Sequence, residues 1–538
     1  MRVKQAVGIL SVMAASIGAA PAEPSSVALA PAVSSVAENC VGLAARLDPA
    51  IADAKAVFSA DSGNLPEHCK VTGAIEKRVG VDGKPYAIGF ELRVPSAWNG
   101  GLVFQGGGGL NGILFPATGR SSTILGGKSP DALQRGFAVV STDSGHIGGN
   151  SAFGRDQQAT LNYSYAFIGK LARVSKQVVQ QLTSRRPART YYMGCSNGGR
   201  EAMIAAQRFP DEFDGVVAAN PAFNIIEAGL LANYSTQIYL RLSLPTQPSP
   251  LTQADLKLVG AAVVKQCDGL DGRQDGMIFA QDACRFDPTV LICKRGQTAD
   301  CLTKAKAEGI RDAFRGPLDV KGKPLFSPWP YDASIGDQGW LAWQTGSLEK
   351  DGRLGQRQNP LVSDAMSGLF SYPPIPQSAL ATLNVEQARL NMAAMAAQLQ
   401  ATDTRMSSFA SRGGKMLLIT GWNDPIFSGH DLTRWYRKLD ADETAVGRPG
   451  AMPFARLFMV PGMLHCGGGQ ALDNVDPLSV LVDWVEKGIA PDRIVATGQA
   501  FPGQSRPLCP YPAYARYDGR GDPADQKSYN CSTEGLPK

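Results

Sequence analysis

Apolar residues follow two alternating patterns in the first and last thirds of the chain. Short continuous apolar runs that end in glycine-rich or turn-rich segments predict buried strands, and the stretch 199–210 has the spacing of an amphipathic helix. The strands are predicted in YAIGFELRVP, GGLVFQGGG, GFAVVSTDSG, TYYMG, DGVVAANP, GGKMLLITGWNDP and ARLFMVPGMLH. Strands that alternate with helices indicate βαβ units, and therefore an α/β fold with a mostly parallel sheet.

The middle of the chain, residues 224–403, lacks this alternation. It is rich in proline, glycine, tryptophan and cysteine. We interpret it as a large inserted lid domain between two parts of one core, residues 23–223 and 404–538.

The N-terminus has the pattern of a secretory signal. Arg2 and Lys4 precede the apolar run AVGILSVMAASIGAA, which ends in small residues. This arrangement predicts a signal peptide over residues 1–22 and a secreted or periplasmic protein, although a buried N-terminal helix is an alternative. No other stretch approaches the ~20 apolar residues of a membrane-spanning helix, so no membrane partner is expected.

Charge adds little to this picture. The 538 residues include 44% hydrophobic and 19% charged residues, and the net charge is +5 with no long run of one sign. Such a balance is typical of an ordinary solvated surface, and nothing in it favours a nucleic-acid partner.

The heptapeptide GCSNGGR, residues 194–200, carries the first candidate chemistry. Gly194 and Gly198 flank Ser196 with the G-x-S-x-G spacing of a nucleophile elbow, in which a serine is exposed on a sharp strand-to-helix turn. Cys195 stands directly beside it and is open to three interpretations: a rival nucleophile, a buried filler or half of a disulfide.

A serine nucleophile needs a base, and the base needs an orienting carboxylate. The chain has four histidines, His68, His146, His430 and His465. In α/β-hydrolases the order is Ser, then Asp or Glu, then His, each on a loop after a strand. His465 follows the last predicted strand and Asp424 follows the one before, so the sequence predicts the triad Ser196, Asp424 and His465.

The ten cysteines include no CxxC motif, which counts against zinc or thioredoxin-like chemistry. Cys195 adjoins the predicted nucleophile and Cys466 the predicted base, so a fold that assembles the triad also brings these two sulfurs together. A bridge across so long a loop would stabilise the fold by about 5 kcal/mol in the chain-entropy model. The other eight cysteines occur as near neighbours, and spacing alone does not fix their pairing.

Paired Cys-Ser and His-Cys motifs with an intervening Asp resemble the tannase and feruloyl esterase family. The resemblance extends over nearly the whole mature chain, through SGNLPEHCKVTGAI, CDGLDGRQDG and RPLCPYPAYARYDGRGD. It implies an α/β-hydrolase fold with an inserted lid. It also implies five disulfides, Cys40–Cys69, Cys195–Cys466, Cys267–Cys284, Cys293–Cys301 and Cys509–Cys531.

The segment CDGLDGRQDGM places three carboxylates, those of Asp268, Asp271 and Asp275, within eight residues. Hard oxygen ligands at this spacing suit Ca²⁺, although the pattern is not an EF-hand and a solvated acidic turn is an alternative. The family's corresponding loop binds calcium. The resemblance therefore implies a structural Ca²⁺ held by these side chains and by the main-chain carbonyls of Arg273 and Met277.

A tetrahedral oxyanion needs N–H donors. The residue after the nucleophile, Asn197, is one expected donor, and a glycine-rich loop after an earlier strand normally supplies the second. FQGGGGLNG, residues 104–112, is such a loop, and the resemblance points to Gly109 within it.

The stretch GWLAWQTGSLEKDGRLGQR contains Trp340, Trp343 and Arg357. An aromatic face with a guanidinium would suit an aromatic acid, although tryptophans are more often in the core and arginines more often solvated. The stretch resembles the lid of a terephthalate monoester hydrolase of the family, which implies that Trp343, Arg357 and Phe370 bind the substrate. The sequence departs from that enzyme by carrying Asn197, Gly108 and Leu361 where it has glutamate, serine and phenylalanine.

Together these features predict a secreted serine carboxylic ester hydrolase acting on a small aromatic ester. The resemblance favours mono(2-hydroxyethyl) terephthalate, cleaved to terephthalate and ethylene glycol through an acyl-enzyme. A feruloyl esterase or tannase acting on plant phenolic esters is the alternative. An alternative of another class is a non-catalytic, calcium-stabilised binding protein. The sequence gives no oligomeric state, and a monomer is assumed.

Overall fold

The computed structural model describes residues 35–120, 127–355 and 358–537. The predicted signal peptide, residues 1–22, and the predicted substrate residue Arg357 lie outside these ranges.

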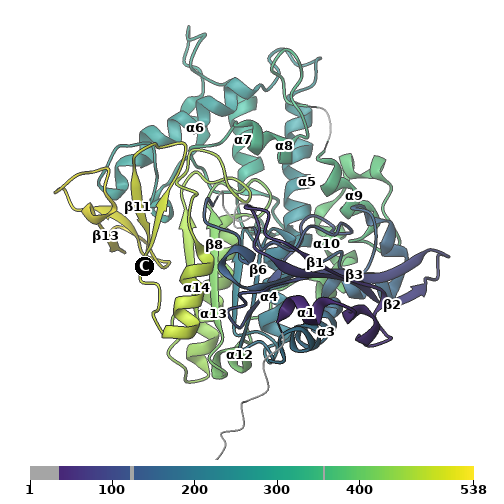
Figure 1. Cartoon of the computed structure of the whole chain (residues 1–538). Coiled ribbons are helices and arrows are strands. Elements are labelled where there is room, and N and C mark those ends of the chain that lie inside the picture. The colour runs from purple at the N-terminus through teal and green to yellow at the C-terminus, as the bar shows by residue number, and fades with distance from the viewer. Residues whose placement is uncertain (1–34, 121–126, 356–357, 538) are drawn as a thin grey trace, which may run out of the picture.

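A nine-stranded sheet forms the centre of the described chain (Figure 1), in the order β1-β2-β3-β5-β4-β6-β7-β8-β9. The strands from β5 to β9 in this order run parallel, whereas β1, β2, β3 and β5 pair antiparallel. The structure thus confirms a mostly parallel sheet. The strands are β1 (Ala52–Ser59), β2 (His68–Val79), β3 (Pro85–Pro95), β4 (Gly101–Gln105), β5 (Ala138–Thr142), β6 (Arg189–Cys195), β7 (Gly215–Ala219), β8 (Lys415–Gly421) and β9 (Ala455–Val460).

The parallel strands are mainly apolar because helices and loops cover both of their faces. Along β8, Met416 and Leu418 join the core on one face, and Leu417 and Ile419 join the core on the other. The first face packs against α1 (Val36–Cys40), α3 (Phe167–Thr183), α4 (Asn197–Arg208) and α13 (Gly429–Ala445), and the second against α14 (Pro477–Lys487).

Strands β1 and β2 have no counterpart among the predicted strands. They extend the sheet at its antiparallel end, where exposed and half-buried residues alternate along most of β1 and no residue of that strand is fully buried. Polar residues therefore interrupt the apolar run that marks the central strands, which explains why the pattern did not reveal them.

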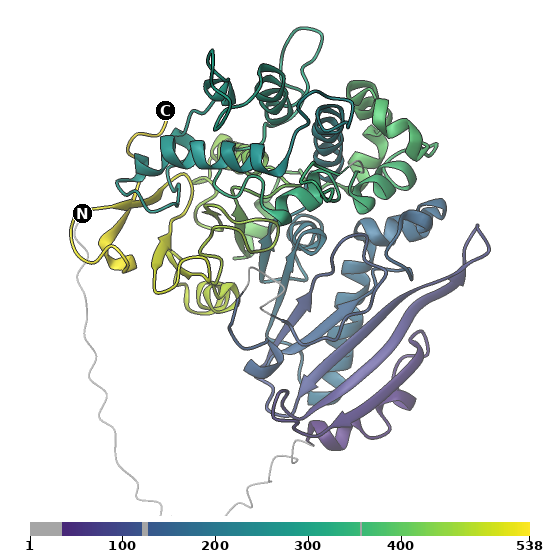
Figure 2. The ribbon, with the colours of Figure 1, turned by 90° about the horizontal axis from the view of Figure 1, so that it is seen from above.

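The chain between β7 and β8 contributes a separate group of helices, shown in teal and green in Figure 2. Tyr239, Phe314 and Trp340 pack in the apolar core of this group. The helices fall inside the predicted lid, 224–403, whose boundaries stay a prediction. They are α5 (Ile225–Leu242), α6 (Gln253–Cys267), α7 (Lys304–Arg315), α8 (Gln338–Gln344), α9 (Pro360–Gly368), α10 (Val385–Asn391) and α11 (Ala393–Leu399).

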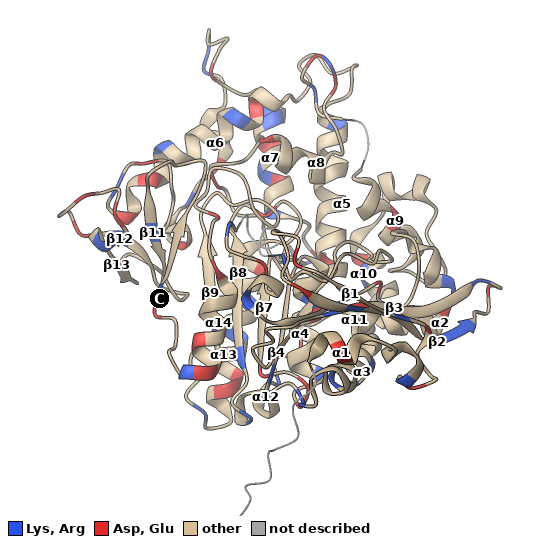
Figure 3. Cartoon of the chain, viewed as in Figure 1, with Lys and Arg blue, Asp and Glu red and all other residues tan. Residues whose placement is uncertain are grey.

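The remaining elements are peripheral. Helices α2 (Gln157–Leu161) and α12 (Ser407–Ser411) are short, and two small hairpins follow α14: β10 (Ile494–Thr497) with β11 (Ser505–Leu508), and β12 (Tyr514–Tyr517) with β13 (Tyr529–Ser532). Basic and acidic residues are interspersed along the surface helices, such as α13 and α14 (Figure 3). Within the described ranges, no helix combines the length and the apolar character that crossing a bilayer requires.

Candidate active site

Ser196 lies on a sharp turn between β6, which ends at Cys195, and α4, which begins at Asn197. Its backbone has φ 61° and ψ −126°, a conformation that non-glycine residues adopt only when their surroundings impose it. The turn is fixed by a hydrogen bond from the Ser196 N–H to the carbonyl of Ala219, at 3.1 Å. A β-carbon at Gly194 would overlap the backbone of Gly198, and one at Gly198 would overlap the carbonyl of Gly107. Gly194 therefore permits the close approach of strand and helix, and Gly198 that of the helix and the glycine-rich loop.

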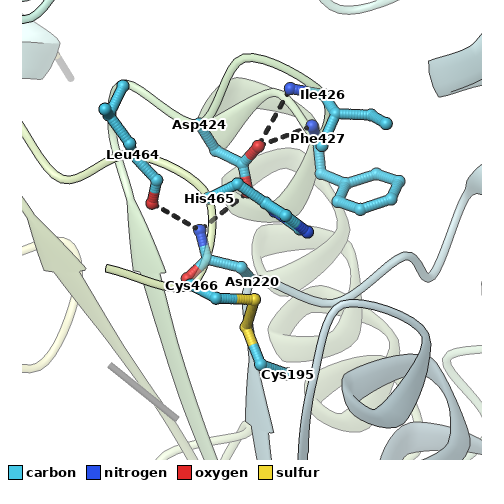
Figure 4. The surroundings of a disulfide bond; sticks show 8 residues. All are labelled: Cys195, Asn220, Asp424, Ile426, Phe427, Leu464, His465 and Cys466. Atoms are coloured by element: carbon cyan, nitrogen blue, oxygen red, sulfur yellow. Dashed lines mark hydrogen bonds and ion pairs between the residues drawn. A yellow bond between two sulfur atoms is a disulfide. The ribbon is translucent and has the colours of Figure 1, made fainter. Parts of the chain in front are cut away.

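The predicted acid and base meet at the ends of β8 and β9, the last two strands of the sheet. Asp424 follows β8 and His465 follows β9, and the His465 Nδ1–H donates to Asp424 Oδ2 at 2.9 Å. Figure 4 shows this contact beside the disulfide that leads back to the serine turn. An imidazole held by Nδ1 leaves Nε2 as the nitrogen that can accept a proton.

Three further donors fix the orientation of the Asp424 carboxylate, which is 1% exposed. Its Oδ1 accepts from the N–H groups of Ile426 and Phe427, at 2.9 and 3.1 Å, and its Oδ2 accepts from Asn220 Nδ2 at 2.7 Å. A buried carboxylate with all these partners has one stable orientation, so it also fixes the tautomer and plane of the imidazole.

The Cys195–Cys466 bond joins the serine turn to the histidine loop, with the two Cα atoms 6.0 Å apart. It excludes a free thiolate at Cys195, because none of the ten cysteines is free. The other four expected pairs, Cys40–Cys69, Cys267–Cys284, Cys293–Cys301 and Cys509–Cys531, are also formed, so all five pairings are confirmed.

A narrow, mainly apolar cavity opens beside Ser196, between the sheet and the inserted helices. It brings together Gly109, Asn197, Trp343 and Phe370, four of the residues predicted to bind substrate or oxyanion. The Trp343 ring stands edge-on to the His465 imidazole, with ring centroids 5.2 Å apart. Trp340 behaves differently, since it is 2% exposed and packs against Tyr239 and Phe314 as a core residue.

A sequence profile described as "Tannase and feruloyl esterase" matches residues 69–532. The chain belongs to the tannase and feruloyl esterase family. It is accordingly a carboxylic ester hydrolase.

Two relatives in the tannase and feruloyl esterase family resemble the chain over most of its length. A mono(2-hydroxyethyl) terephthalate hydrolase from Piscinibacter sakaiensis is 37% identical, over 88% of this chain and 86% of its own. A probable feruloyl esterase B-2 from Neosartorya fischeri is 28% identical, over 86% of both chains.

Two solved structures share the fold. Feruloyl esterase B from Aspergillus oryzae has a TM-score of 0.76 at 23% identity, covering 93% of this chain and 100% of that one. The tannin acyl hydrolase from Aspergillus niger has a TM-score of 0.70 at 21% identity, covering 94% and 97%. These matches confirm the α/β-hydrolase fold of the tannase and feruloyl esterase family.

Glu201 is a site residue that the sequence did not reveal. Its fully buried carboxylate accepts from the Gly107 N–H at 3.0 Å, from Tyr192 Oη at 2.9 Å, and from the side-chain amides of Asn111 and Asn197. It thereby connects the glycine-rich loop to the start of α4. These two segments carry the expected oxyanion donors, Gly109 and Asn197. The signal in the sequence was the helical spacing of Asn197 and Glu201, which places both on one face of α4.

The acidic loop lies beside the C-terminal hairpin, where the Arg273 guanidinium lies over the ring of Tyr517. Burial, reinforced by the neighbouring carboxylate of Asp275, raises the pKa of Asp271 to about 8 and also raises the pKa of Asp268. Asp275 pairs with the buried Arg506. Across residues 35–120, 127–355 and 358–537, no three or more His, Cys, Asp and Glu side chains are arranged to hold a metal ion.

Removal of the active-site disulfide by Cys195→Ser with Cys466→Ser should lower kcat on p-nitrophenyl acetate by about 10²-fold, because a misplacement of about 1 Å is enough for such a loss. The free energy of unfolding should fall by up to about 5 kcal/mol. Steady-state kinetics and thermal unfolding measure the two effects. Cys293→Ser with Cys301→Ser removes a short-loop bridge from the insertion and is the control. Full activity in the first double variant would refute the bracing role.

Glu201→Gln should damage the oxyanion loop without changing side-chain volume. One carboxylate oxygen becomes an NH₂ group that faces existing donors, and each buried unsatisfied group costs about 1–3 kcal/mol. We expect a lower Tm and a fall in kcat approaching the ~10²-fold loss seen when an oxyanion donor is removed. Glu486→Gln, which also loses an acceptor of a tyrosine hydroxyl, is the control. Equal kinetics in the two variants would contradict this role.

Proposed function

We propose that the chain is a secreted or periplasmic serine esterase in which Ser196, His465 and Asp424 are nucleophile, base and orienting acid. The observation that carries the proposal is the Asp424–His465 hydrogen bond beside a serine on a strained strand-to-helix turn. Five disulfides support an oxidising compartment, since such bonds are rare where thiols are kept reduced.

One imidazole, that of His465, both takes up and gives back a proton during the reaction. His465 Nε2 takes the proton of Ser196 Oγ as this oxygen attacks the ester carbonyl, and then gives it to the departing alcohol. An acyl-enzyme remains. Water, activated by the same imidazole, then attacks the acyl carbonyl and releases the acid while Ser196 recovers its proton. Asp424 stabilises the imidazolium that forms in each step.

The negative charge on the carbonyl oxygen requires donors that are fixed before the reaction. We assign this role to the N–H groups of Gly109 and Asn197, whose residues both line the cavity at Ser196. Gly109 has φ +56°, in the left-handed region that favours glycine, which supports a specialised loop conformation. The Asn197 N–H lies at the start of α4, where the helix dipole also favours an anion.

The acyl group of the substrate is proposed to be an aromatic acid. The cavity walls are mainly apolar and include Trp343, Leu361, Phe370 and Phe427, which suit a planar ring. The name of the Piscinibacter sakaiensis relative supports mono(2-hydroxyethyl) terephthalate as the substrate, with Arg357 pairing with its free carboxylate. A feruloyl or galloyl ester is the second candidate, supported by the feruloyl esterase relatives.

We also propose a structural Ca²⁺ at the acidic loop. Its oxygen donors, the carboxylates of Asp268, Asp271 and Asp275 with the main-chain carbonyls of Arg273 and Met277, are of the kind that Ca²⁺ prefers. The raised pKa values of Asp268 and Asp271 support the proposal, because a bound cation would offset both the burial and the mutual repulsion of these carboxylates.

The substrate class is tested by kcat/KM for mono(2-hydroxyethyl) terephthalate and for methyl ferulate. We expect the half-ester to be preferred and Arg357→Ala to lower its kcat/KM by about 10–100-fold, the worth of a hydrogen-bonded charge pair, while methyl ferulate hydrolysis changes little. Arg353→Ala, in the same lid segment but paired with Asp351, is the control. No preference in the parent and no effect of Arg357→Ala would disprove the terephthalate assignment.

Calcium is tested by thermal unfolding with and without EGTA. Binding to the native state alone adds about 2.7 kcal/mol of stability at a hundred times Kd, so EGTA should lower Tm and added CaCl₂ should restore it. Asp271→Asn should abolish this response, whereas Asp287→Asn, outside the loop, should keep it. Superimposable unfolding curves for the parent with and without EGTA would rule out the site.

A further inference from the structure

The loop that carries His465 is a narrow turn with its base at residues 462 and 470. Met463 forms a bridge to Gly469, and the Leu464 N–H donates to the carbonyl of Gly468 at 3.2 Å. His465 and Cys466 lie at the far end of this turn, so the position of the imidazole depends on how both ends of the turn are held. The disulfide to Cys195 holds the far end.

Two side chains of the insertion hold the residues at which the turn begins and ends. Asp332 Oδ2 accepts a hydrogen bond from the Gly462 N–H at 2.7 Å. Ser334 Oγ donates to the Gly462 carbonyl at 2.9 Å and accepts from the Gln470 N–H at 2.7 Å. Both side chains are 0% exposed. One short segment of the lid thus bonds three main-chain groups of the histidine loop, on both of its strands.

The same insertion contacts the loop of the acid. Gln344, fully buried at the end of α8, donates from Nε2 to the carbonyl of Pro425, the residue after Asp424. The main-chain carbonyl of Gln344 accepts a hydrogen bond from Thr236 Oγ1 of α5 at 2.6 Å, which connects α8 to the core of the insertion. The inserted helices therefore hold the loops of two triad residues as well as lining the cavity.

The two residues where the turn begins and ends, Gly462 and Gln470, are tightly packed against each other. This packing leaves little room for other groups to take over the role of Asp332 and Ser334. Gly462 has φ +67°, and a β-carbon there would overlap the carbonyl of Gln470. Burial raises the pKa of Asp332 to about 6, which is still below neutral pH. The group is therefore a carboxylate at neutral pH, and both of its oxygens can accept hydrogen bonds. One accepts from Gly462 and the other from the Ala333 N–H, at 2.6 Å.

We infer that the insertion is a structural part of the catalytic machinery, in which Asp332 and Ser334 are positioning residues that hold His465 in register with Ser196. This inference rests on the proposed role of His465 as the base. It separates two tasks of the lid, since substrate contact is made by Trp343 and its neighbours and loop support by Asp332 and Ser334.

The test uses p-nitrophenyl acetate, whose acetyl group is too small to need the aromatic walls of the cavity. Asp332→Ala and Ser334→Ala should each lower kcat by about 10- to 100-fold with KM within about twofold. Each substitution displaces the His465 imidazole and leaves the substrate contacts intact. Asp332→Asn keeps one acceptor oxygen and should recover part of the loss. Trp343→Ala should instead act mainly on KM for aromatic esters.

Asp440→Ala is the matched control, because the Asp440 carboxylate also accepts a loop N–H, that of Ala451 at 2.8 Å, before β9 begins. It should lower Tm while kcat stays that of the parent. A kcat within twofold of the parent in Asp332→Asn and Ser334→Ala, with Ser196→Ala inactive, would overturn the inference alone. Full activity in Ser196→Ala would instead overturn the proposed function. If Asp332→Ala does not fold, the two milder variants decide.

Discussion

The covalent bond between Cys195 and Cys466 is the constraint on which the proposed catalytic geometry depends. It joins two residues that are 271 positions apart in the chain, one beside the proposed nucleophile and the other beside the proposed base. A parallel sheet brings the ends of β6 and β9 to the same edge but leaves their loops free to move separately. The disulfide removes that freedom, so a single sulfur bridge takes the place of many weaker contacts in keeping Ser196 and His465 together.

Hydrogen bonds complete what the disulfide begins. Asn220, at the end of β7, reaches the Asp424 carboxylate, while Glu201 fastens the glycine-rich loop to the start of α4. The insertion holds the histidine loop through the hydrogen bonds of Asp332 and Ser334 to Gly462. Each reacting group is therefore held by partners on at least one other segment. This is the preorganisation that charge development in a tetrahedral intermediate requires.

The sequence predicted the parts of this site that follow from strand order and missed those that follow from burial of polar groups. Ser196, Asp424 and His465 could be found because each follows an apolar strand in a known order. Glu201 and Asn220 were missed. Helical spacing places Glu201 on the same face of α4 as Asn197, but no pattern marks a polar residue on a helix or at a strand end as buried. Likewise, Trp340 and Trp343 look alike in sequence, yet one packs in the core of the insertion and the other meets His465. The choice of Gly109 within its loop, and of the Arg273 and Met277 carbonyls as proposed calcium ligands, was reached only through the family resemblance.

The most direct test of the account is a crystal structure of the protein after reaction with a small fluorophosphonate. The account predicts a phosphonyl group on Ser196 Oγ, its oxygen between the N–H groups of Gly109 and Asn197, with His465 on Asp424 and the Cys195–Cys466 bond intact. An adduct on another residue, or a phosphonyl oxygen that points away from both N–H groups, would contradict it.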